Sequence, residues 1–130
     1  MNALTYACFA VVLASLGVAS APKVDHEGKA WLDRYKEPAA INVDGLWHSD
    51  DWGDVILEQA EGAREVTGSG DGWDINGVVS GGAVYLLFSD DGEVNYSAEL
   101  TDDHEKRLRG VYSSGLMHEK SKKKPMLLTR

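Results

Sequence analysis

The sequence predicts an all-β protein, in which an antiparallel up-and-down meander of eight strands closes into a small barrel behind a signal peptide and a short N-terminal helix. Three observations predict this fold class. From residue 43 onward, short runs alternate between apolar and polar residues with the period of a strand. Turns rich in Gly and Asp separate the runs and leave little room for crossover connections. Glycine also recurs inside several runs, as tightly coiled small barrels require.

The N-terminal segment has the features of a secretory signal peptide. The first 21 residues carry no charged side chain, and their apolar run ends in Ala19, Ser20 and Ala21. Small residues at these places are typical of a signal-peptide cleavage site. We therefore expect residues 1–21 to be removed by cleavage between Ala19 and Pro22, and the mature protein to be extracytoplasmic, periplasmic or secreted, with no membrane attachment. An uncleaved anchor or a buried helix is the alternative.

Residues 22–42 are predicted to form a leader that precedes the barrel domain at residues 43–130. Within the leader, residues 26–36 have the pattern of a short helix, with Trp31 and Tyr35 one turn apart on one face and Pro38 marking its end. A helix of so few turns is not stable alone. It must therefore either pack against the barrel or fray.

The strands are predicted, in chain order, at residues 43–49, 54–59, 63–69, 73–80, 83–89, 94–101, 106–113 and 125–129. Because side chains alternate between the two faces of a strand, one face of each run is assigned to the barrel interior. That face carries Val43, Trp47, Val55, Leu57, Trp73, Ile75, Val79, Val84, Leu86, Phe88, Val94, Tyr96, Ala98, Leu100, Leu108, Tyr112, Met126 and Leu128.

The opposite face carries more large apolar residues than a solvated surface needs, namely Leu46, Ile56, Val78, Tyr85, Leu87, Val111 and Leu127. We predict that the leader helix docks on the outside of the barrel through Trp31 and Tyr35. The predicted contact surface on the barrel is Ile56, Val78, Tyr85 and Leu87. Self-association into a homodimer is the competing way to cover the same surface.

Composition excludes several classes of function. All 21 acidic and 13 basic residues follow the signal peptide, so the mature chain keeps the net charge of −8 and is not expected to bind nucleic acid. The single cysteine, Cys8, lies in the segment expected to be removed, which leaves no disulfide. The histidines lack metalloprotease spacing, and the acidic turns lack that of a calcium loop. We expect no enzyme activity, no cofactor and no bound metal.

The order of three motifs resembles a known group of barrels. Gly45 and Trp47 open the first strand, Asp51, Trp52 and Gly53 follow, and a late strand carries Gly-Val-Tyr at residues 110–112. In this order they resemble the calycin-type meander barrels, the lipocalin and avidin superfamilies, over residues 43–130. The resemblance implies the closed barrel fold. The last strands have no Trp to match the biotin-stacking tryptophans of avidins, so biotin is not the expected ligand.

Aromatic side chains mark the candidate binding residues. Three tryptophans lie in or beside neighbouring strands, and two tyrosines share their face, so they line a small apolar or sugar-binding pocket if they gather at one mouth. For Trp47 and Tyr96 the favoured interpretation is that they fill the barrel, because eight strands enclose an interior only just wide enough for side chains. Trp52 lies in an acidic loop, where we expect an exposed indole that contacts a ligand or partner. The candidate contact residues are Asp51, Trp52, Asp54, Trp47, Trp73, Tyr96 and Tyr112.

These features predict an exported small β-barrel binding module, monomeric or homodimeric, whose unknown partner is a small ligand or a protein. The alternative is an inhibitor of a secreted or cell-envelope hydrolase that uses the N-terminal leader or a loop end. The lysine-rich loop at residues 117–124 is either a solvated hairpin tip or a docking surface for an anionic partner.

Overall fold

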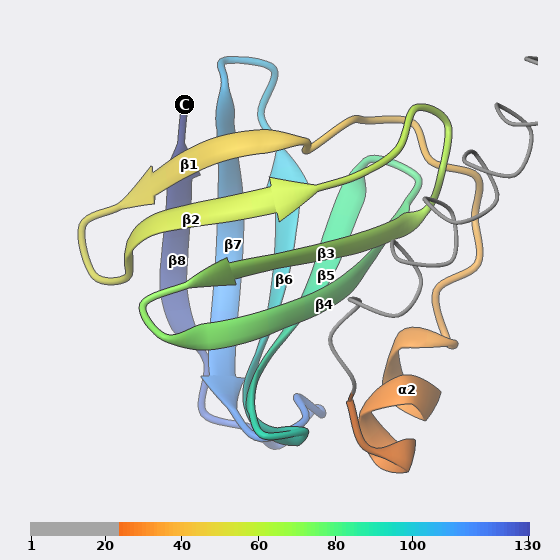
Figure 1. Cartoon of the computed structure of the whole chain (residues 1–130), viewed down its shortest axis with the longest axis vertical. Helices are drawn as coiled ribbons and strands as arrows, with labels where there is room; N and C mark the ends of the chain where they lie inside the picture. Colours follow the sequence, from red (N-terminus) through yellow and green to blue (C-terminus); the bar gives the residue numbers. More distant parts are fainter. Residues whose placement is uncertain (1–23) are drawn as a thin grey trace, which may run out of the picture.

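The computed structural model describes residues 24–130, so the predicted signal peptide lies outside the described residues. Eight antiparallel strands form a closed barrel in which each strand pairs with the next one in sequence and β8 pairs with β1 (Figure 1). The predicted all-β meander is confirmed. The first and last residues of every predicted strand differ from the observed ones by at most two positions. The elements are α2 (His26–Leu32), β1 (Gly45–Ser49), β2 (Gly53–Glu58), β3 (Glu65–Gly70), β4 (Trp73–Ser80), β5 (Ala83–Asp90), β6 (Glu93–Asp102), β7 (Arg107–Ser114) and β8 (Lys124–Thr129).

Glycines inside strands allow the barrel to coil tightly. In Figure 1 the strands β1 to β4 cross the view, while β6 to β8 run nearly vertically behind them. A Cβ atom at Gly68 would collide with the carbonyl oxygen of Ile56 on β2, and one at Gly110 would collide with that of Glu99 on β6. The backbones of neighbouring strands therefore approach one another at these positions more closely than any side chain would permit.

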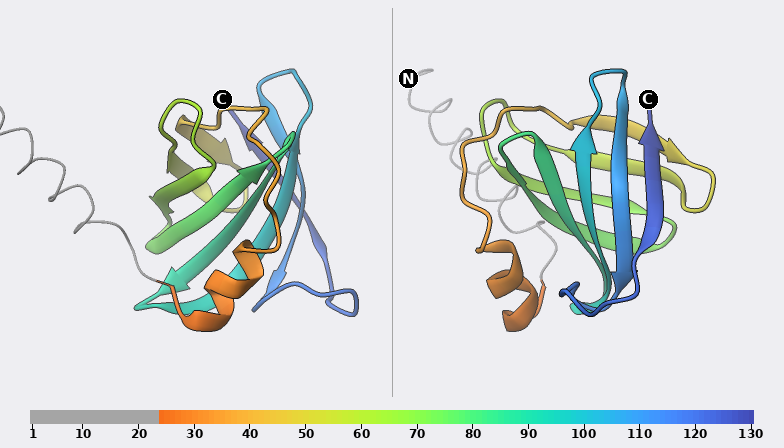
Figure 2. Two further views of the ribbon diagram at one scale, coloured as in Figure 1. Left: turned by 90° about the vertical axis from the view of Figure 1, so that its right-hand side faces the viewer. Right: turned by 180° about the vertical axis from the view of Figure 1, so that it is seen from behind.

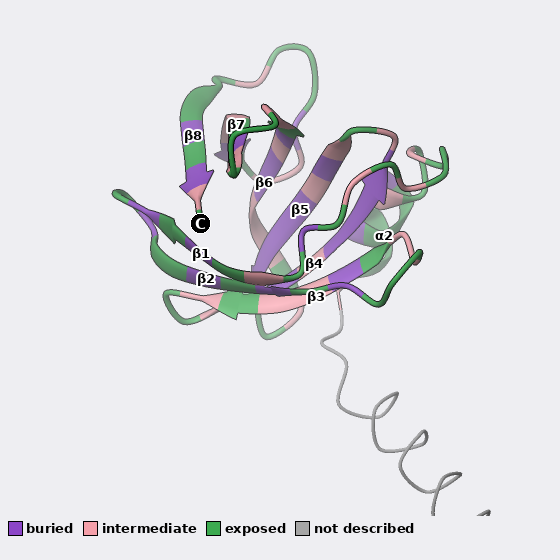
Figure 3. Cartoon of the chain, turned by 90° about the horizontal axis from the view of Figure 1, so that it is seen from above, coloured by how far each residue is buried: buried purple, intermediate pink, exposed green. Residues whose placement is uncertain are grey.

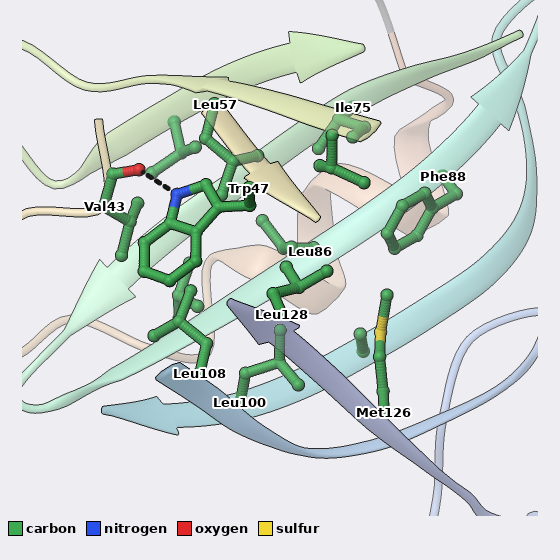
Figure 4. Packing of buried hydrophobic residues seen from close by; sticks show 14 of the residues in the cluster. Val43, Trp47, Leu57, Ile75, Leu86, Phe88, Leu100, Leu108, Met126 and Leu128 are labelled. Atoms are coloured by element: carbon green, nitrogen blue, oxygen red, sulfur yellow. Dashed lines mark hydrogen bonds between the residues drawn. The ribbon is translucent and has the colours of Figure 1, made fainter. Parts of the chain in front are cut away.

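The barrel interior is filled by apolar side chains, with Trp47 and Phe88 the largest fully buried ones (Figure 4). Every residue predicted for the interior belongs to this core or packs against it, except Val94. The assignment of Val94 is wrong because the pairing of β5 with β6 shifts by one residue, so that Phe88 faces Tyr96 but Ser89 faces Val94. A bulge of one residue reverses the faces of the strand beyond it. Val94 therefore points outward.

The leader helix α2 packs on the outside of the barrel against β5 (Figure 2), as predicted. Trp31 is buried with Leu87 and Met117 in a second apolar cluster. The ring of Tyr35 stacks on that of Tyr85, with 3.6 Å between centroids and 7° between planes. Docking therefore covers the outer face of β5.

Two details of the docking prediction are wrong. Ile56 remains 48% exposed, because it lies on β2, away from the strand that α2 covers. Exposed and buried residues accordingly alternate along β2 and β8 (Figure 3). The helix ends at Leu32 and not at residue 36, since the backbone N–H of Tyr35 bonds the Leu32 carbonyl at 3.1 Å and closes a tighter turn. The turn still brings Tyr35 onto the barrel.

The stacked tyrosines make helix docking sensitive to alkaline pH. Burial raises the pKa of Tyr35 and of Tyr85, and the negative charge of Glu99 raises both further. A folded-state pKa above the ordinary tyrosine value of about 10 means that the folded chain holds these protons more tightly than the unfolded chain. Their contribution to stability is therefore complete below a pH of about 10 and is lost as the pH rises through the folded-state values.

We expect the melting temperature of the wild-type chain to fall above this pH, and to fall less steeply in the double variant Tyr35→Phe and Tyr85→Phe. Thermal melts followed by far-UV circular dichroism at closely spaced pH values measure both curves. Parallel curves above a pH of about 10 would show that the tyrosine pair does not carry this dependence.

Candidate functional site

One end of the barrel is closed by the chain that enters it. After α2 the backbone runs along the outside and crosses this end before β1 (Figure 2), with Ala39 bridged to Gly81 in the β4–β5 turn. The indole N–H of Trp47 donates to the carbonyl of Val43 at 2.8 Å. The guanidinium of Arg130, at the end of the chain, lies 4.3 Å from the centre of the Trp47 ring. Trp47 thus belongs to the closed end and is 2% exposed.

A buried glutamine fixes the crossing segment. The side-chain oxygen of Gln59 accepts the backbone N–H of Val43 at 2.7 Å. Its amide nitrogen donates to the carbonyls of Ile41 at 3.2 Å and Ala63 at 2.8 Å. A buried amide with all of these partners stabilises the closure, since any of the groups left unpaired would carry a desolvation cost.

The opposite end is open and forms a hollow of about 480 Å³. We call this hollow the mouth. It is built from the β1–β2 and β3–β4 turns, the adjoining ends of β4, β6, β7 and β8, and the loop that joins β7 to β8. Its lining consists of Asp51, Trp52, Asp71, Trp73, Tyr96, Tyr112, Ser113, Ser114, Lys122 and Lys124.

Aromatic rings form the floor of the mouth. Trp52 lies 4.7 Å from Phe88 of the barrel core and meets the rings of Tyr96 and Tyr112 edge-on at 5.2 and 5.3 Å. Trp73 meets Tyr96 edge-on at 5.6 Å. The rings hold one another in fixed orientations, which presents rigid apolar surface at little cost in side-chain entropy.

The expectation of an exposed indole at Trp52 is wrong, because this side chain is only 8% exposed. The hydroxyl of Ser49 accepts the backbone N–H groups of Asp51 at 3.3 Å and of Trp52 at 3.2 Å. These bonds fold the acidic loop into a tight turn, and the indole lies against the core at the end of the barrel. Trp52 is therefore the floor of the mouth and not a projecting contact.

Charges of both signs surround the floor. Asp51 and Asp71 come from the β1–β2 and β3–β4 turns, whereas Lys122 and Lys124 come from the β7–β8 segment. None of these four side chains takes part in an ion pair among the described residues. All four are exposed, so their charges are available to a molecule that enters the mouth.

The structure brings five of the seven candidate residues together in the mouth: Asp51, Trp52, Trp73, Tyr96 and Tyr112. The other two candidates, Trp47 and Asp54, lie outside the mouth. Trp47 lies at the closed end, and Asp54 is on the outer surface, 3.2 Å from Nδ1 of His48. The lysines are not among these seven residues, although the sequence marks their loop at residues 117–124 as either a solvated tip or a docking surface for an anionic partner. Pairing of Tyr112 with Lys124 across β7 and β8 places that lysine beside the aromatic floor, and neither strand carries this register in its own sequence.

The described part of the chain shows neither a metal centre nor a membrane helix. Within residues 24–130 no three His, Cys, Asp or Glu side chains are grouped to hold a metal ion. No helix of this region is long and apolar enough to span a bilayer. Comparisons with known protein families, curated proteins and solved structures find no significant match.

Proposed function

We propose that this chain is an exported binding module that holds a small ligand at the open mouth of its barrel. One observation carries the proposal. Four aromatic side chains, Trp52, Trp73, Tyr96 and Tyr112, converge from separate segments on one hollow, while the opposite end is closed. Concave sites lined by aromatic rings with a few polar groups are the usual form of small-molecule sites in proteins.

The lining favours a ligand with a flat apolar face and charged or polar substituents. The rings offer indole and phenol surfaces for a planar group or for the apolar face of a sugar. A hollow of about 480 Å³ is within the range of pockets that enclose small molecules. Lysines on one segment and carboxylates on others would meet substituents of opposite charge.

The proposal includes two further points: the chain acts without catalysing a reaction, and its barrel is of the calycin-like type. The closed meander topology supports the latter. The alternative is an inhibitor of a secreted or envelope hydrolase. Inhibition through the leader has less support, since Trp31 of the leader is only 5% exposed and is packed against the barrel. Inhibition through the loop end remains compatible with the charged mouth and is an outcome of the test below.

Native mass spectrometry of the mature protein, purified from its own host, tests the proposal. We expect a small molecule to be retained by the wild-type chain and released at least about tenfold more readily by Tyr112→Ala, because truncating a tyrosine at the centre of a binding site costs about 2 kcal/mol when that residue is a hot spot, and about 1.4 kcal/mol is already tenfold in affinity. Leu46→Ala is the matched control, since Leu46 is 58% exposed and lies outside the mouth.

A protein that co-purifies in place of a small molecule, and that Tyr112→Ala releases, would replace the proposal with the inhibitor. Retention of a small molecule by Tyr112→Ala at the wild-type level would contradict the mouth as its site.

A further inference from the structure

The leader helix touches the end of the barrel where the mouth lies. α2 lies beside the β5–β6 turn and the β7–β8 loop (Figures 1 and 2). The backbone N–H of Asp25, which caps the helix, donates to the carbonyl of Gly92 in the β5–β6 turn at 3.2 Å. The indole N–H of Trp31 donates to the carbonyl of Met117 in the β7–β8 loop at 2.9 Å. One short helix thus ties two of the connections at this end of the barrel together.

Met117 is held from two sides. Its carbonyl accepts from Trp31, and its own N–H donates to the hydroxyl of Ser97 on β6 at 2.8 Å. Both bonds are buried, and Met117 is only 4% exposed. Buried hydrogen bonds of this kind are costly to break, because the separated groups find no water. The loop is therefore attached to the barrel wall on one side and to the helix on the other.

The rest of the loop connects Met117 to the lining of the mouth. The N–H of His118 donates to the hydroxyl of Ser121 at 2.9 Å, and the N–H of Ser121 donates back to the His118 carbonyl at 3.0 Å. This compact turn joins Met117 directly to Lys122, which lines the mouth. A displacement of Met117 therefore displaces the lysine.

We propose that Trp31 is a positioning residue for the mouth, and that docking of α2 holds the β7–β8 loop and its lysines in place over the aromatic floor. The leader then controls the mouth, although it contributes none of its lining. If the mouth binds a ligand, as proposed above, linkage requires that the ligand stabilise the docked helix by the same factor by which docking tightens binding. A partner that displaced the leader would loosen the site.

The test compares Trp31→Phe with the wild-type full chain. This change keeps an aromatic ring against Tyr35 and Tyr85 and removes the N–H donor. Amide exchange of Met117 is expected to become roughly five- to tenfold faster, the effect of one lost buried hydrogen bond. Spin labels at Asp51→Cys and Lys122→Cys, which both line the mouth, should give one narrow distance distribution in the wild-type background and a broader one with Trp31→Phe.

Tyr35→Phe is the matched control. It removes the hydroxyl that bonds Oε1 of Glu99 at 3.3 Å and leaves the bond to Met117 intact. It should therefore leave Met117 exchange and the label distance unchanged. Unchanged exchange and distance in Trp31→Phe would overturn the proposal. Neither measurement uses a ligand, so the result is independent of whether the mouth binds one.

A measurement on the wild-type chain tests the same proposal without a variant, so it holds even if Trp31→Phe does not fold. The Met117 amide, the Trp31 indole N–H and the helix amide of Lys29 should exchange with one common opening free energy as denaturant is raised, because they open together. Protection of Met117 that persists after Lys29 has exchanged would also overturn the proposal.

Discussion

Replacing Gly110 by alanine is expected to lower the free energy of unfolding by about 3 kcal/mol, at the upper end of the cost of overpacking. The new Cβ would collide with the carbonyl oxygen of Glu99 and would lie 2.9 Å from Cα of Leu100. Both atoms belong to the backbone of β6, which pairs with β7 at this position. No rotamer change can relieve the contact, so two strands of the barrel must move apart.

Gly82→Ala is the matched control, because nothing lies within 4 Å of a Cβ there. The same change at Gly82 should be neutral or slightly stabilising, by up to about 1 kcal/mol, since alanine restricts the unfolded chain. Urea denaturation of both variants gives the two free energies. Equal stability of the two variants would contradict the close approach of β6 and β7.

Trp47→Ala is expected to be the most damaging substitution at the closed end, with a loss of about 4 kcal/mol. The indole is 2% exposed, bonds the Val43 carbonyl and supports Arg130. Its removal would leave a cavity and an unpaired carbonyl, and it would release the segment that crosses the barrel.

Trp73→Ala removes the same side chain at the mouth, where the residue is only partly buried. Its cost should be less than half that of Trp47→Ala, because much of its surface is already in contact with water. Thermal and urea denaturation measure both. Similar losses of unfolding free energy in the two variants would contradict a closed end at Trp47 and an open end at Trp73.

The strand pattern was readable from the sequence because each run is half buried. Alternation and turn residues are local signals, so residues such as Ile75 and Leu86 were assigned to the interior without knowledge of their neighbours. The docking of Trp31 and Tyr35 was predictable for a related reason. Apolar residues on the outer face, among them Leu87, needed a cover, and the leader held the only matching pair of aromatic residues.

The features that escaped prediction depend on contacts between distant residues. The bulge that turns Val94 outward is set by the pairing of β5 with β6. The burial of Trp52 depends on the Ser49 hydroxyl folding its loop, and Lys124 reaches the mouth through its pairing with Tyr112. A single strand carries no signal of its register with the next, so the place of Lys122 and Lys124 beside the aromatic floor could not be read from the sequence alone.

The indole N–H resonances of the four tryptophans give the most direct test of the mouth as the binding site. Trp52 and Trp73 lie in the mouth, Trp47 at the closed end and Trp31 at the contact between helix and loop. In a ¹⁵N-labelled sample titrated with the small-molecule extract of the host's cell envelope, binding at the mouth predicts that the Trp52 and Trp73 resonances shift most and that Trp47 does not shift. A shift of Trp47 with Trp52 and Trp73 unchanged, or no shift at all, would contradict the account.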